Sequence, residues 1–138
     1  MMPDFVRVCA VIIILFSQAY FCMASVPFLF VRLDIPEVSR LFRGLFDLYF
    51  WIAALTGFVA SGVFAASGRI GFTAAMLLLA VASIAGRRPV LQWIDTQQSA
   101  LQSGDTAAMR RLRLIHWGGM LTNILVIAGV ASSVQFII

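Results

Sequence analysis

A few polar residues lie in or beside the long apolar stretches of this chain, and their types could support chemistry. His116 is the only histidine, and Asn123 follows it by seven residues, so both lie on one face if this segment is helical. Gln18 lies within another apolar stretch, and Asp47 and Arg113 stand at the ends of two more. Such groups can bind a ligand or relay a proton, so we treat these five as a candidate functional polar cluster.

The pattern favours a structural role for this cluster over a catalytic one. A metal or haem site needs more strong ligands than one histidine supplies, unless two chains pair. The sequence also lacks the HExxH, GxSxG, phosphate-loop, dinucleotide and CxxC motifs. We predict no catalytic residue, metal or cofactor, with a haem or quinone at His116 kept as an alternative. An interfacial cluster of Asp47, Arg113 and His116 that fixes helix register is favoured over a proton-coupled one.

The segments that position these residues are four stretches without charged side chains, at about 8–31, 48–68, 70–86 and 114–136. About 20 helical residues cross the hydrocarbon of a bilayer, and the chain is 62% hydrophobic with a mean hydropathy of +0.98. The first stretch is longer than the roughly 7–15 apolar residues of a signal peptide, so we interpret it as a span. The sequence therefore predicts an all-α fold, a single four-helix membrane domain over residues 1–138.

The charged residues predict the orientation of these spans. All ten basic residues are arginines, and with four spans only Arg7 and Arg69 share a side with the two termini. The other eight lie on the opposite side: Arg32, Arg40, Arg43, Arg87, Arg88, Arg110, Arg111 and Arg113. The positive-inside rule then places the arginine-rich loops in the cytoplasm and both termini outside a bacterial inner membrane. Because the arginines alternate with apolar runs, we do not expect nucleic-acid binding.

The two arginine-rich connections are predicted to be helical extensions of the spans. Asp34 is a candidate N-cap, with Pro36 in the first turn of the helix that follows. Pro89 is expected to open a second extension. Asp105 or Thr106 is expected to cap a last helix that runs without interruption into the fourth span.

Small residues in the second span recur at four-residue intervals, at Ala53, Gly57, Ser61 and Ala65. Lipid provides no hydrophobic force between helices, so such residues allow the close packing that holds spans together. We expect this face to pack within one compact bundle. The alternative is a homodimer or larger membrane complex assembled through the same face.

Two carboxamides are predicted at a similar depth. Asn123 lies about 15 Å inside the boundary that Arg113 marks, and Gln18 is near the middle of the first span. A direct hydrogen bond between them would join the first and last helices. The alternative is that each bonds to a backbone carbonyl or to Ser17, Thr56 or Ser83. His116 is only about 4–5 Å inside the boundary, so with Trp117 it is expected at the membrane interface.

One stretch, "VPFLFVRLDIPEVSRLFRGLFDLYFW", resembles the first inner loop of a bacterial family of small four-span proteins of unknown function. That family is similar to transmembrane protein 205 of eukaryotes. The likeness rests on an apolar residue and proline at the span end, followed by Leu45, Phe46 and Tyr49.

A second stretch, "GDTAAMRRLRLIHWGGMLTN", resembles the same family's approach to its last span. Arg113, His116 and Asn123 match the family pattern, whereas Ile115 replaces a leucine and Gly119 replaces a serine. The resemblance implies a four-helix integral membrane protein with no established reaction. A weaker similarity to small four-span proteins grouped with anthrone oxygenases keeps an enzyme among the alternatives.

Three functions follow from these observations. The favoured one is a non-enzymatic accessory subunit or a factor in envelope behaviour and tolerance of toxic compounds. The second is a carrier of a small or amphipathic molecule, which with only four spans would need an oligomer. The third is a membrane oxidoreductase or oxygenase that uses His116 and Asn123. The bilayer is the one partner that all three share.

Overall fold

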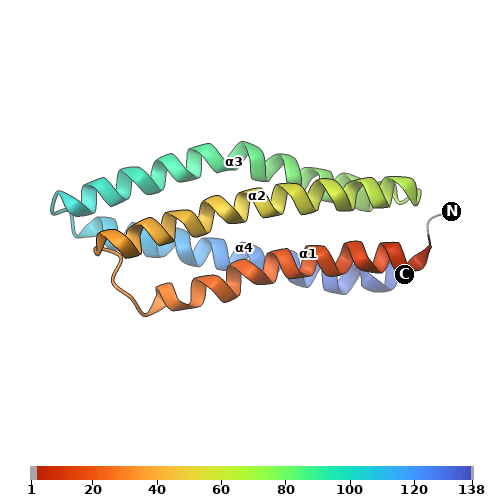
Figure 1. The fold of residues 1–138 in the computed structure, drawn as a ribbon, viewed down its shortest axis with the longest axis horizontal. Helices are drawn as coiled ribbons and strands as arrows, with labels where there is room; N and C mark the ends of the chain where they lie inside the picture. Colours follow the sequence, from red (N-terminus) through yellow and green to blue (C-terminus); the bar gives the residue numbers. More distant parts are fainter. Residues whose placement is uncertain (1–2, 138) are drawn as a thin grey trace.

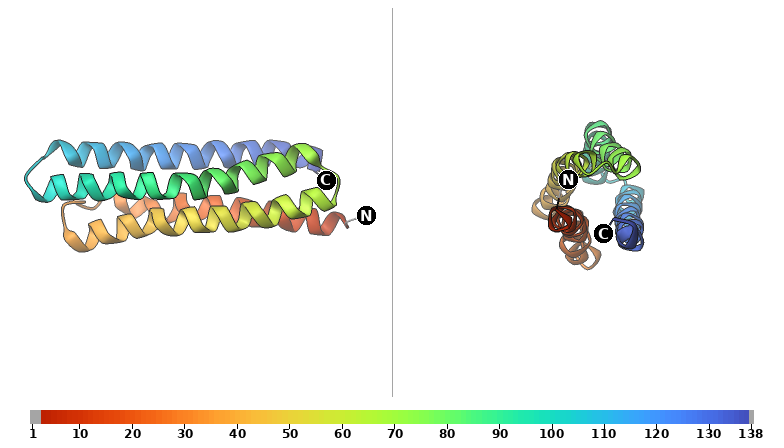
Figure 2. Two further views of the ribbon diagram at one scale, coloured as in Figure 1. Left: turned by 90° about the horizontal axis from the view of Figure 1, so that it is seen from above. Right: turned by 90° about the vertical axis from the view of Figure 1, so that its right-hand side faces the viewer.

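The structure, a computed structural model that describes residues 3–137, is a bundle of four long helices. They are α1 (Asp4–Ser25), α2 (Pro36–Ala66), α3 (Ile70–Gln102) and α4 (Ala107–Ile137), with a short 3-10 helix, η1 (Val26–Leu29), after α1. The helices alternate in direction (Figure 1). Both termini and the α2–α3 turn lie at one end, here called the terminal end, and the other two connections lie at the opposite loop end (Figure 2). This arrangement confirms the predicted all-α helical bundle.

All four helices are long and apolar enough to cross a membrane, as expected for a multi-pass membrane protein. The 33 residues of α3 measure about 50 Å, well beyond the roughly 30 Å of bilayer hydrocarbon. The excess lies at the loop end, because the charge-free part of α3 is next to the terminal end. Helices α2 and α4 likewise continue through their arginine-rich segments, which confirms the predicted helical extensions.

Two of the predicted helix boundaries are wrong. Pro36 does occupy the first turn of α2, but Ile35 is the N-cap residue and Asp34 makes no cap. Asp34 instead pairs with Arg32 at 2.6 Å, and this hydrogen bond holds the pKa of the carboxyl below its usual value. Pro89 does not open a helix but lies inside α3. Asp47 on α2 binds Arg87 on one side of Pro89, and Leu91 is buried on the other, so tertiary contacts hold the helix together across the proline.

The turn between α3 and α4 follows the prediction more closely. Gly104 has a φ of +97°, a left-handed conformation that glycine adopts without strain. Asp105 then accepts a hydrogen bond from the backbone N–H of Ala107 at 3.0 Å and so caps α4, as predicted. The helix continues without a break to Ile137.

The helices do not pack equally closely. Helix α2 makes its most extensive contacts with α3, and α1 contacts both α2 and α4, whereas α3 and α4 contact each other the least among these neighbours. The main apolar cluster lies toward the loop end and comprises Phe21, Leu33, Phe42, Leu45, Phe46, Leu91, Ile94 and Leu112. A second cluster at the terminal end is built around Val11, Ile14, Phe64 and Met76. Over much of their length, α3 and α4 are therefore separated rather than packed.

The close contact of α2 with α3 depends on the small-residue face of α2. A Cβ at Gly57 would lie 3.0 Å from the Met76 carbonyl oxygen and 3.0 Å from the Ala80 Cβ. Ala53 and Ser61 are also buried, while Ala65 is exposed. The central part of this face is thus occupied within the chain itself.

We predict that Gly57→Ala destabilises the bundle. The new methyl group would overlap the α3 backbone, and overpacking of this kind typically costs about 1–3 kcal/mol. The matched control is Gly62→Ala on the same helix, where a Cβ would meet no atom within 4 Å. Thermal unfolding in detergent should show a lower midpoint for Gly57→Ala only. Equal midpoints for the two variants would contradict the α2–α3 contact.

Candidate functional site: polar residues beside a central cavity

Three helices bring polar side chains together in the bundle interior. The hydroxyl of Tyr49 on α2 donates a hydrogen bond to Oε1 of Gln18 on α1 at 3.0 Å. Asn123 on α4 is buried as well, and its Nδ2 donates to the Gly119 carbonyl at 2.9 Å. Gln18 and Asn123 are 0% and 1% exposed. These three residues, here called the polar trio, come from α1, α2 and α4, and the Tyr49–Gln18 bond joins the first two.

The expected direct hydrogen bond between the two carboxamides is therefore wrong. The phenol of Tyr49 donates to Gln18, and Asn123 uses a backbone carbonyl of its own helix, which was the predicted alternative. Sequence reasoning did not select Tyr49 as a polar partner. The available signal was a phenol two residues after Asp47, near the predicted start of the second span. Whether its hydroxyl points toward Gln18 depends on how α1 and α2 pack.

The trio has unused hydrogen-bonding capacity. Nε2 of Gln18 and Oδ1 of Asn123 are buried and have no hydrogen-bond partner within residues 3–137. A buried amide without a partner is unfavourable by roughly 1–3 kcal/mol on protein mutational scales. The predicted alternative partners do not meet this need, because Thr56 donates to Ser17 and Ser83 bonds to the Leu79 carbonyl. One donor and one acceptor near the middle of the bundle are therefore left for a water molecule or a ligand.

His116 faces the interior of the bundle, whereas Trp117, the other residue of the predicted interfacial pair, faces outward. His116 has no exposed surface, and the rings of Phe28 and Phe42 pack nearly perpendicular to the imidazole, with centroid distances of 6.4 and 5.6 Å. Trp117, one residue later, is 56% exposed. Successive residues of a helix point about 100° apart, so the rings of His116 and Trp117 face different sides. The predicted depth of the two residues therefore could not tell which ring faces inward.

The expected interfacial cluster of Asp47, Arg113 and His116 does not form. Asp47 pairs with Arg87 of α3 at 2.7 Å. Arg113 donates to the carbonyls of Phe28 and Val31, which follow the end of α1. Within the described residues, neither ring nitrogen of His116 has a hydrogen-bond partner.

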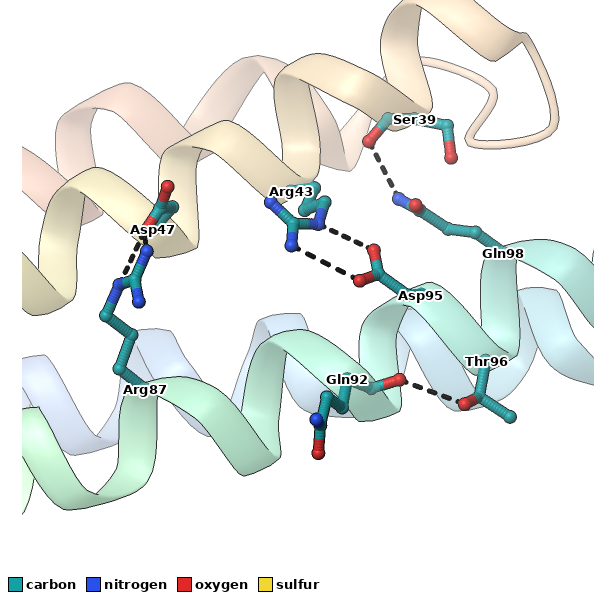
Figure 3. Close-up of polar contacts among 8 residues, drawn as sticks. All are labelled: Ser39, Arg43, Asp47, Arg87, Gln92, Asp95, Thr96 and Gln98. Atoms are coloured by element: carbon teal, nitrogen blue, oxygen red, sulfur yellow. Dashed lines mark hydrogen bonds and ion pairs between the residues drawn. The ribbon is translucent and has the colours of Figure 1, made fainter.

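Asp47 instead belongs to a series of contacts that joins α2 to α3 at the loop end (Figure 3). Beyond the Asp47–Arg87 pair, Arg43 and Asp95 form a two-point ion pair, with nitrogen–oxygen distances of 2.6 and 3.2 Å. Further along, the amide of Gln98 donates to the Ser39 carbonyl at 2.7 Å. We call these three contacts the α2–α3 ladder, and they hold α3 against α2 where the helices extend beyond their apolar parts.

A cavity of about 400 Å³ lies between α3 and α4 beside the polar trio. Four aromatic rings contribute to its wall: Phe21, Phe46, Tyr49 and Phe50. The side chains that line it carry no formal charge. Its polar members are Tyr49, Asn123, Ser83 and Thr122, and the last two already bond to carbonyls of their own helices. The cavity thus suits a neutral, mainly apolar molecule with one hydrogen-bonding group.

No family model, curated protein or solved structure matches this chain. The resemblance to the transmembrane protein 205-like family therefore remains a prediction from its short motifs, and the site is interpreted from its own geometry.

We predict that Tyr49→Phe and Gln18→Leu destabilise the protein non-additively. Removing either group leaves the other without its partner, and coupling energies for such membrane hydrogen bonds average about 0.6 kcal/mol, with values up to about 1.7. A double-mutant cycle on unfolding free energy in detergent measures this coupling. Tyr20→Phe is the control, since this tyrosine is also half-buried and lies on α1 next to the main apolar cluster. Additive effects at Tyr49 and Gln18 would refute the contact.

Proposed function

We propose that this is a multi-pass protein of a bacterial inner membrane, with its loop end in the cytoplasm and both termini outside. The distribution of arginine supports this orientation. Eight arginines belong to the loop end, whereas only Arg7 and Arg69 belong to the terminal end. The loop-end arginines include those of the α2–α3 ladder and Arg113, so the basic residues also stabilise the helical extensions.

Reporter fusions test this orientation. A periplasm-active phosphatase should be active when fused at either terminus, and a cytoplasm-dependent fluorescent reporter inserted at Gly104 should fluoresce. Gly104 lies in the exposed turn between α3 and α4, where an insertion disturbs the helices least. Phosphatase activity from the Gly104 insertion together with silent termini would reverse the proposed topology.

We further propose that the protein binds a small neutral amphipathic molecule in the central cavity, without chemical conversion. The observation that carries this proposal is the cavity itself. It is mainly apolar with four aromatic rings in its wall, and it is lined by Tyr49 and by Asn123, whose buried Oδ1 has no hydrogen-bond partner within the described residues. Such a combination of an apolar pocket and a few polar groups is typical of small-molecule sites.

The position of the cavity supports entry from the lipid. Its walls come largely from α3 and α4, the two neighbouring helices with the least contact, and lining residues Gly118 and Thr122 are exposed on the bundle surface. An apolar molecule dissolved in the bilayer could reach this site without crossing water. Binding of this kind fits an accessory or tolerance factor that retains a membrane-soluble compound. A carrier would need the same site in an oligomer, because four spans are few for alternating access.

His116 contributes less to this proposal than its residue type suggested. Its ring packs against Phe28 and Phe42, and the residue is not among those that line the cavity. A redox or oxygenase function at His116 would require these rings to move. We therefore assign ligand contact to Tyr49 and Asn123.

A photoreactive phenol with a diazirine group tests the binding site. In the reconstituted protein it should label residues 79–90 and 115–123, identified by mass spectrometry. Gly118→Leu should abolish this labelling, because the residue lines the cavity and a Cβ there meets no atom within 4 Å. Gly44→Leu is the matched control, since that position is equally open but lies outside the cavity.

Asn123→Leu provides the polar arm of the same test. It should weaken labelling by the phenol by about two- to tenfold, as expected for loss of one hydrogen bond, and should leave labelling by the matching hydrocarbon probe unchanged. Equal labelling of wild type and Gly118→Leu by the phenol would overturn the proposed site.

A further inference from the structure

A larger cavity, of about 580 Å³, lies at the terminal end and is separate from the central one. All four helices contribute apolar side chains to it, including Ile14, Phe64, Met76 and Val130. Like the central cavity, it extends between α3 and α4, here where α3 begins and α4 ends. An apolar space of this size, next to the boundary of the membrane, suits a hydrocarbon chain.

Arg69 is the one charged residue among those that line this cavity. It stands in the short turn between α2 and α3, directly before the first residue of α3. One guanidinium nitrogen, Nη1, donates to the Phe136 carbonyl near the end of α4 at 2.7 Å. A guanidinium has five N–H donors, so this bond fixes the group at the cavity while leaving other donors for an anion.

From these observations we propose that the terminal cavity binds an anionic phospholipid, with one acyl chain inside and the phosphate at Arg69. The apolar wall matches the chain, and the guanidinium matches the charge of the head group. The side chains that line the cavity include no carboxylate, so no lining charge opposes the phosphate. This site is independent of the proposed ligand at the polar trio, which is neutral and lies nearer the middle of the bundle.

Native mass spectrometry of protein released from nanodiscs tests the proposal. The nanodiscs should contain equal amounts of phosphatidylglycerol and phosphatidylcholine with the same acyl chains. We expect one retained lipid per chain, with phosphatidylglycerol favoured about fivefold, the preference that one arginine near the membrane surface can supply. Arg69→Gln should remove the preference, and Arg69→Lys should keep most of it. Arg88→Gln, at an exposed arginine of the other end, should leave it unchanged.

Filling the cavity tests the acyl chain separately from the charge. Gly129→Leu should abolish retention of both lipids, because Gly129 lines the cavity and a Cβ there meets no atom within 4 Å. Gly62→Leu, at an equally open position outside the cavity, is its control.

Circular dichroism shows whether each variant keeps its helices. If Arg69→Gln does not fold, lipid retention by Gly129→Leu tests the proposed site. Equal retention of the two lipids by wild type would overturn the proposal. So would unchanged retention by Gly129→Leu, or an equal loss of preference in Arg88→Gln.

Discussion

The close approach of α2 to α3 is the contact on which the rest of the bundle depends. Because lipid gives helices no hydrophobic reason to associate, the two must be held by surfaces that fit and by polar contacts. Gly57 provides the fit against Met76 and Ala80, and the α2–α3 ladder provides the polar contacts at the loop end. Because α3 packs against α2 and α4 packs against α1, the space between α3 and α4 remains open. Both cavities lie in that space.

Much of this fold could be predicted from the sequence, because lipid constrains what the chain can do. Every backbone group must find its partner within a helix, so an uncharged run of sufficient length predicts a span and its approximate ends. The cap at Asp105 could be predicted for a similar reason, since it depends on residues next to it in the chain. Pro89 was misleading because a contact from another helix, Asp47 with Arg87, forms beside it. Asp34 was misleading because its carboxylate pairs with Arg32, two residues before it, and does not cap the helix.

The candidate site was less predictable, and the reason is geometric. Counting residues from a boundary gives the depth of a side chain, and Gln18 does bond to Tyr49, which lines the central cavity together with Asn123. Counting does not give the rotation of a helix against its neighbours. That rotation decided that His116 faces two phenylalanine rings while Trp117 faces outward, and that Asp47 meets Arg87 rather than Arg113. The two cavities are the features least predictable from the sequence, since they arise where two helices do not pack closely.

The bonds from Arg113 to the Phe28 and Val31 carbonyls have a consequence for biosynthesis. These partners are 85 and 82 residues apart in the chain, so the first connection must emerge long before its guanidinium partner is made. Until α4 is inserted, the carbonyls that follow α1 have only water or lipid head groups to bond with. The nascent protein therefore passes through a stage in which α1, α2 and α3 are made and the loop end is unfinished, until α4 completes it.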